Sequence, residues 1–190
     1  IEAETALASV LNKTAVTNVT STDKPQKSRE VWKTEEEKTE ANELWNLLLD
    51  NLAGKCAVYS KGRRSGSSGT IRVKHPNHPL VTFYMTHLGS LIGLRIDGGD
   101  IEANVALFDM IYEQKTEIEN ETGLEFVWKR STTSKRQSIN CSDKFTKDFA
   151  SDWCTSDLAV PHREGWSVYL DWMTENAPKF EKAILKAIGS

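Results

Sequence analysis

The sequence lacks the features that most directly reveal a secreted, membrane or zinc-binding protein. Its three cysteines form no close-spaced pair, which argues against a disulfide framework or a zinc finger. No apolar run approaches the roughly 20 residues that a membrane-spanning helix needs. The first residues also lack the basic and apolar regions of a secretory signal. These absences favour a protein of the reducing cytoplasm that makes no membrane contact.

No motif in the chain predicts a catalytic residue, a metal or a cofactor. The Gly- and Ser-rich segment 62–69 lacks the lysine and hydroxyl residue that end a phosphate-binding loop. His75, His78 and His87 follow Cys56, but their spacing does not match a tetrahedral zinc site. We therefore expect no metal and no cofactor, and we favour a chain that is not itself an enzyme.

Acidic residues are missing from two long stretches of the chain, although the formal net charge is only −3. The first stretch lies between Asp50 and Asp97, and the second runs from Phe126 to Ser142. Together they carry eleven Lys and Arg residues, so opposite charges are segregated along the chain. Clustered cations bind phosphate backbones because they release condensed counterions. The predicted nucleic-acid contacts are Lys61, Arg63, Arg64, Arg72, Lys74, Lys129, Arg130, Lys135 and Arg136.

These cations also have a second interpretation, in which they pair with the acidic helices of the same fold. Nucleic-acid binding requires the cations to converge on one open face. Pairing would instead scatter them or neutralise them with neighbouring carboxylates.

The stretch from Asp100 to Trp128 predicts a helix that ends at a glycine and leads directly into a strand. Asp100 is suited to cap the helix, and apolar residues then recur at steps of three and four. Gly123 is placed to adopt the left-handed conformation that ends a helix, and the residues after it alternate as in a strand. Lys115 and Glu119 lie one helical turn apart, which predicts a surface ion pair.

The rest of the pattern predicts one α+β domain over residues 34–190, preceded by an extension over residues 1–33. The extension is rich in Thr, Ser, Asn and Lys, and residues 2–13 within it favour a short helix. Thr34 and Glu37 form a capping box for the first helix of the domain. A final helix begins near Arg163, and Pro178 should kink or restart it.

The further strands predicted by alternation and turn residues cover residues 57–60, 71–73, 81–86, 91–97 and 136–141. Segment 62–69 is expected to be an exposed loop, and segment 142–161 has no clear period and is expected to be irregular. The expected architecture is a mostly antiparallel sheet with helices packed on it. Its element order is helix, strands, helix, strands, helix.

Several residues of these elements match the pattern of a known family. They are Asp97, Asn104, Phe108, Lys115, Ile118, Glu119, Gly123, Phe126 and Trp128. This run resembles the uncharacterised bacterial domain family DUF4268. A weaker likeness over residues 35–188 extends to Trp45, Arg136, Ser138, Trp166 and Trp172. The resemblance implies shared roles for the family-motif residues Asn104, Phe108, Lys115, Glu119, Trp128 and Ser138.

The resemblance implies a setting but no established activity. In related proteins such domains often lie on the C-terminal side of restriction-type or other nuclease modules. The element order also resembles the core of restriction-type nucleases, although the expected strands lack the acidic-x-Lys motif. We therefore predict a non-catalytic accessory domain of a bacterial or phage nuclease or defence protein. It would bind DNA or RNA and act beside a nuclease module in the same or a partner chain. The alternatives are a protein-interaction or oligomerisation module and a metal-dependent restriction-type nuclease.

Overall fold

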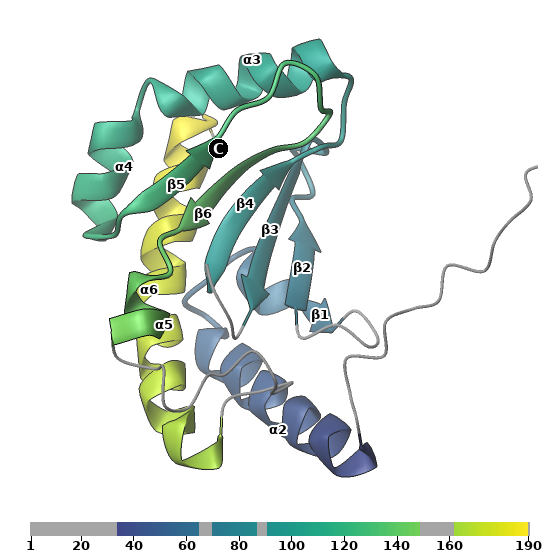
Figure 1. The fold of residues 1–190 in the computed structure, drawn as a ribbon, viewed down its shortest axis with the longest axis vertical. Helices are drawn as coiled ribbons and strands as arrows, with labels where there is room; N and C mark the ends of the chain where they lie inside the picture. Colours follow the sequence, from purple (N-terminus) through teal and green to yellow (C-terminus); the bar gives the residue numbers. More distant parts are fainter. Residues whose placement is uncertain (1–33, 65–69, 87–90, 149–161, 190) are drawn as a thin grey trace, which may run out of the picture.

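The computed structural model describes residues 34–64, 70–86, 91–148 and 162–189, in which helices pack on a β-sheet (Figure 1). The predicted N-terminal extension and its short helix lie outside the described residues. The helices are α2 (Glu35–Leu52), η1 (Tyr59–Lys61), α3 (Ile101–Tyr112), α4 (Lys115–Thr122), α5 (Lys144–Asp148), η2 (Arg163–Gly165) and α6 (Trp166–Ala187). The strands are β1 (Arg63–Arg64), β2 (Thr70–Lys74), β3 (Val81–Thr86), β4 (Ile92–Ile96), β5 (Phe126–Lys129) and β6 (Gln137–Cys141).

The sheet has six strands in the order β1-β2-β3-β4-β6-β5, and every neighbouring pair is antiparallel. The first four strands form a meander, after which α3 and α4 lead to the hairpin of β5 and β6. Because β6 inserts beside β4, β5 becomes an edge strand. The α+β fold with a mostly antiparallel sheet is confirmed.

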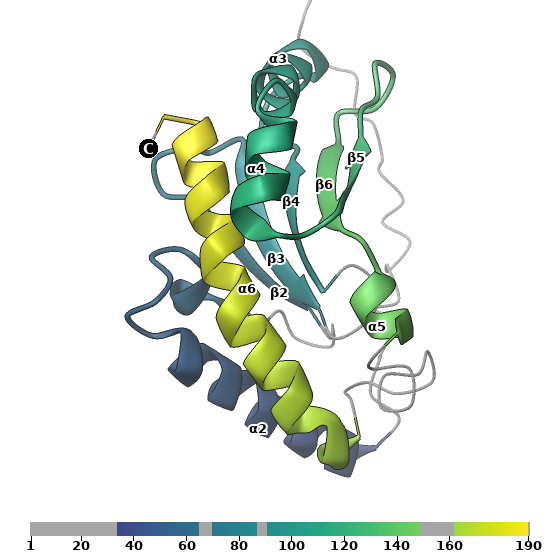
Figure 2. The ribbon, with the colours of Figure 1, turned by 90° about the vertical axis from the view of Figure 1, so that its left-hand side faces the viewer.

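Side chains alternate between two different faces of the sheet. On the inner face Phe83 pairs in register with Leu94, which in turn pairs with Ile139, and all three are buried. The ring of Phe83 lies 6.3 Å from that of Phe180 in α6, and the ring of Phe126 lies 5.1 Å from it. Helix α6 therefore covers the inner face, and α2 and α4 pack against α6 (Figure 2).

The predicted helix starts and the glycine stop are confirmed. Thr34 and Glu37 form the capping box, because each side chain bonds to the other's backbone N–H. Asp100 accepts a hydrogen bond from the backbone of Ala103 at 2.8 Å and caps α3. Gly123 ends α4 in the left-handed conformation at φ 67°.

One predicted helix is divided into α3 and α4, with Gln114 at the break. No glycine or proline marks this position. The Gln114 side chain donates a hydrogen bond to the carbonyl of Ala187 at 3.1 Å, which caps the end of α6. A contact distant in sequence thus accompanies the break, and α4 packs along α6.

The final helix, in contrast, is not restarted at Pro178, because α6 continues from Trp166 to Ala187. Proline cannot donate to the carbonyl four residues earlier, which costs one helical hydrogen bond. Met173, Ala177 and Phe180 are nevertheless buried on both sides of the proline. Burial of one continuous apolar face keeps the helix together.

Three local predictions differ from the structure. Residues 57–60 lead into the 3-10 helix η1 instead of forming a strand. In the predicted loop 62–69, Gly62 is buried and Arg63–Arg64 form β1, while residues 65–69 lie outside the described range. Gly62 packs so closely against Ile71 that an added Cβ would lie only 2.5 Å from the Ile71 side chain. Segment 142–161 contains the short helix α5, and residues 149–161 are not described.

Candidate nucleic-acid interface

The outer face of the sheet carries a row of polar and basic residues that crosses the strands. In register the row reads Lys74, Thr82, Arg95, Ser138 and Lys129, from β2 through β3, β4 and β6 to β5. Neighbouring strands lie about 4.8 Å apart, so a cation recurs along the row about every 10 Å. Residues far apart in the sequence thus form one cationic line, which we call the outer-face row.

A second row lies beside the first on the same face. It joins Arg72 of β2 to Tyr84, Gly93 and Asn140. Arg72, Lys74 and Lys129 are exposed, and among the described residues none of the three forms an ion pair. The helices α2, α4 and α6 pack on the opposite side of the sheet (Figure 2). Within the described ranges, these three cations on the outer face therefore have no acidic partner.

The central cation of this face, Arg95, is partly buried among other guanidinium groups. Burial lowers the pKa of Arg95, and the positive charges of Arg136 and Arg72 lower it further, while Asp97 opposes them. The Arg95 and Arg136 Nε atoms lie 4.0 and 3.8 Å from Asp97 Oδ2. A single carboxylate thus stands among three arginines, and the local charge is positive.

A hollow of about 460 Å³ opens on this part of the sheet. It is lined by Arg72, Lys74, Pro79, Thr82, Arg95, Asp97 and Gly98. We refer to it as the outer-face hollow. Its lining offers hydrogen-bond donors from the three basic residues and an acceptor from Asp97. These donors and this acceptor together suit a ligand that carries both an anionic group and a hydrogen-bond donor.

Tyr84 lies in the middle of the outer face, over the glycine of the neighbouring strand. A Cβ added to Gly93 would lie 2.4 Å from the Tyr84 hydroxyl oxygen, so the ring occupies the space above this glycine. The hydroxyl donates a hydrogen bond to Asn140 Oδ1 on β6. The aromatic ring is held across the face by residues of two other strands.

The predicted nucleic-acid contacts are only partly brought together. Arg72, Lys74, Lys129 and Arg136 share the outer face, and Lys135 is exposed in the loop before β6. Lys61 is exposed in η1 at the β1 end of the sheet.

Two further predicted contacts, Arg63 and Arg64, form β1, where Arg63 pairs in register with Arg72. The structure describes the backbone of these two arginines but not the placement of their side chains. Arg130 does not join the set, because it binds Asp109 of α3 through two hydrogen bonds of 2.7 and 2.8 Å. This ion pair raises the pKa of Arg130 and lowers that of Asp109.

Arg95 and Asp97 are the central residues that the sequence-based set of contacts omits. A usable signal was present, since Arg95 and Asp97 alternate with Ile92, Leu94 and Ile96 and must face away from the core. Asp97 ends the first acid-free stretch and carries a negative charge, so charge segregation does not point to it. Arg95 lies within that stretch and is one of its cations, although it is not among the predicted contacts.

Most family-motif residues support the fold on the inner side of the sheet. Asn104 is buried, and its amide bonds to both the N–H and the carbonyl of Gly99 at 3.0 and 3.1 Å. The same amide donates to the carbonyl of Lys135 at 2.8 Å. Asn104 therefore ties the start of α3 to the loop between β5 and β6, which carries part of the basic surface.

Phe108 and Trp128 of the family motif belong to an aromatic cluster under β5. The Phe108 and Trp128 rings meet edge to face at 6.1 Å, and the Trp128 indole donates to Glu119 at 3.1 Å. Lys115 lies 5.9 Å from the centre of the Tyr112 ring. The expected Lys115–Glu119 ion pair is absent from the described part of the chain. Ser138 alone among the motif residues lies on the outer-face row.

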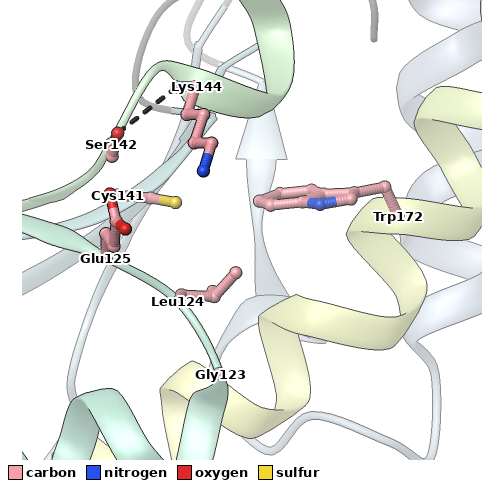
Figure 3. Close-up of a pocket in the computed structure, with 7 residues that line it drawn as sticks. All are labelled: Gly123, Leu124, Glu125, Cys141, Ser142, Lys144 and Trp172. Carbon is pink, nitrogen blue, oxygen red and sulfur yellow. Dashed lines mark hydrogen bonds between the residues drawn. The ribbon is translucent and has the colours of Figure 1, made fainter. Parts of the chain in front are cut away.

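A second, smaller hollow of about 240 Å³ lies between the segment that joins α4 to β5, the end of β6, α5 and α6 (Figure 3). Figure 3 shows the Lys144 side chain reaching into the space between Cys141 and Trp172. Burial and, to a smaller extent, the charge of Glu125 raise the pKa of the Cys141 thiol to about 12. The thiol stays protonated near neutral pH and is a poor nucleophile.

The described residues contain no group of three or more side chains suited to hold a metal ion. The His75 and His78 rings lie 4.9 Å apart, whereas His87 is not described. Burial lowers the pKa of His75, and the neighbouring His78 lowers it further. Within the described ranges, no helix is long and apolar enough to cross a membrane.

The fold and the outer face define an α+β domain with a helix-covered inner face and a basic outer face. The family model of a domain of unknown function, DUF4268, matches residues 77–188, which is more than half of the chain. The chain belongs to this family. No curated protein and no solved structure was found to match it.

Proposed function

We propose that the chain is a non-catalytic accessory domain that binds nucleic acid across the outer face of its sheet. We also propose that it serves a nuclease or defence protein of a bacterium or phage, as the family resemblance implies. The observation that carries the binding proposal is the outer-face row. Its cations come from three strands and two acid-free stretches, yet they lie in one line.

The direction of the row supports a backbone that crosses the strands. Lys74, Arg95 and Lys129 repeat about every 10 Å along that direction. Arg72 is level with Gly93 across the strands, and Arg136 lies beside Asp97, so the two arginines broaden the line on either side of Arg95. Binding to such a surface depends mainly on counterion release, so affinity must fall steeply as salt rises.

The experiment measures how salt affects the binding of the full chain to fluorescent single-stranded oligonucleotides. Four to five phosphate contacts on a single strand predict a slope of log K against log salt of about −3. The double variant Lys74→Gln/Lys129→Gln removes the two exposed ends of the row. It should weaken binding and make the slope shallower by about 1.4, since each contact contributes about 0.7.

A matched control removes two cations from the helical side of the molecule. Lys55 and Lys182 are both exposed and line a groove beside α6, so Lys55→Gln/Lys182→Gln makes the same change in net charge. The control should keep the wild-type slope. Undetectable binding at low salt, or equal losses in both double variants, would contradict the proposal. Cleavage that requires Mg²⁺, or a stable oligomer without nucleic acid, would favour the alternative functions instead.

A further inference from the structure

The outer-face hollow has the size and chemistry of a site for one polar unit of a ligand. Its volume of about 460 Å³ lies within the range of small-ligand sites, about 300–1,000 Å³. It lies at the β2 to β4 part of the outer-face row, where a bound nucleic-acid strand would pass. The inference below rests on the proposed function, because the nucleic acid supplies the unit that enters the hollow.

The basic residues of the hollow are suited to hold a phosphate. Arg72 and Lys74 are exposed on β2, and Arg95 is partly buried on β4, with 25% of its side chain accessible. Guanidinium groups present planar pairs of N–H donors that match the oxygens of a phosphate. Arg95 is partly buried between other residues, so its side chain loses less conformational freedom when it binds a phosphate.

Asp97 is the feature that a simple phosphate site does not explain. Its carboxylate lines the hollow and would repel a bare phosphate. Its separations of 4.0 Å from Arg95 and 3.8 Å from Arg136 are too long for hydrogen bonds. The side chain is 32% accessible, so its oxygens are free to accept a bond from a ligand. The repulsion is offset when the ligand presents a hydroxyl next to its phosphate.

We propose that the outer-face hollow binds a ribonucleotide unit of single-stranded RNA and discriminates RNA from DNA. Arg95, with Arg72 and Lys74, holds the phosphate, and Asp97 accepts a hydrogen bond from the ribose 2′-hydroxyl. Arg95 and Asp97 are two residues apart on the same face, about 6.7 Å along the strand. That spacing lets one nucleotide reach both side chains. The 2′-hydroxyl is the group by which a protein distinguishes RNA from DNA at one position.

The test compares oligo(U) with oligo(dU), which differ only in the 2′-hydroxyl. The wild-type chain should bind oligo(U) about tenfold more tightly, as expected for a hydrogen bond to a carboxylate. Asp97→Ala should abolish this preference, and it should bind oligo(dU) more tightly than the wild type because a repulsive charge is gone. Asp97→Asn keeps the side-chain volume and should also reduce the preference. The control Asp171→Ala, at an exposed position of α6, should leave the ratio unchanged.

The outcomes separate this inference from the proposed function. Salt-dependent binding of both oligonucleotides with equal affinity would overturn the RNA inference and leave the nucleic-acid interface intact. A preference for RNA that survives in Asp97→Ala would overturn the role of Asp97. Binding of neither oligonucleotide would overturn both proposals together.

Discussion

The buried carboxylate of Glu181 provides a sharp test of how the helical layer stabilises the β1–β2 end of the sheet. Glu181 belongs to α6 and is only 3% exposed. It accepts hydrogen bonds from the successive backbone amides of Ala57, Val58 and Tyr59 at 2.5, 2.9 and 2.8 Å. A side chain distant in sequence thus fixes the segment that leads through η1 into β1.

The expected magnitude follows from these three hydrogen bonds. A bond to a charged acceptor contributes about 1.5–3 kcal/mol, and an unpaired buried donor costs about 1–3 kcal/mol. In Glu181→Gln the side-chain amide oxygen can still accept hydrogen bonds from the backbone N–H groups that face it. The NH₂ group that replaces the other carboxylate oxygen is a donor, and it faces a backbone N–H that is also a donor. We expect the free energy of unfolding to fall by about 3 kcal/mol for Glu181→Gln and by about 5 kcal/mol for Glu181→Ala. These are large fractions of the roughly 5–15 kcal/mol that stabilises a typical domain.

Urea denaturation followed by tryptophan fluorescence measures both variants. The control Glu175→Gln removes a carboxylate from the exposed surface of the same helix, where it pairs with Lys179 at 2.7 Å. An exposed ion pair contributes about 0–1 kcal/mol, so this variant should remain close to the wild type. If Glu181→Gln lost no more than the control, the three amides would not depend on this carboxylate, and the reasoning would be refuted.

Two further predictions concern pH and the outer face. The pKa values of the buried Cys56 and Cys141 thiols are raised to about 12, mainly by burial. Thiols of the unfolded chain ionise near about 8.5, so above that pH the unfolded state binds fewer protons and the free energy of unfolding falls. Urea midpoints should therefore decline from about pH 8 to 10, and a flat profile would contradict this cause. The substitution Gly93→Ala forces a methyl group into the space of the Tyr84 ring, and it should lower the free energy of unfolding by about 1–3 kcal/mol in the same assay. A decrease of less than about 0.5 kcal/mol would show that the Tyr84 ring moves freely out of the way.

Local patterns predicted much of the fold because the physics that sets them is also local. The capping box of Thr34 and Glu37, the cap of Asp100 and the stop at Gly123 depend on residues within a few positions. Large apolar residues alternate with Thr, Tyr, Gly or Arg in β3 and β4, so both faces of those strands could be assigned from sequence alone.

The errors lie where distant parts of the chain determine local conformation. Gln114 lies where a helical pattern is interrupted, and its side-chain amide donates a hydrogen bond to the end of α6 at that break. Residues 57–60 have apolar character that suits a strand, but their amides bind Glu181 and lead into η1. Neither partner can be inferred from spacing along the sequence.

The candidate site likewise depends both on local sequence patterns and on contacts between distant parts of the chain. Charge segregation pointed to stretches whose cations partly share the outer face, but their convergence requires the strand order β2-β3-β4-β6-β5, which no local pattern supplies. Arg130 illustrates the limit, since its acidic partner Asp109 lies in a helix outside both acid-free stretches. The outer-face hollow could not be predicted, because its walls come from β2, β3, β4 and the segments before β3 and after β4.

The antiparallel register makes the basic surface sensitive to insertions and deletions in the strands. Deletion of one residue within β4 would shift the alternation, turning Arg95 towards α6 and Leu94 towards solvent. A two-residue change would preserve the faces but would move Arg95 away from Ser138 and Thr82. Length variation compatible with this surface is therefore confined to the connecting segments, while the strands that carry the cations keep a fixed number of residues.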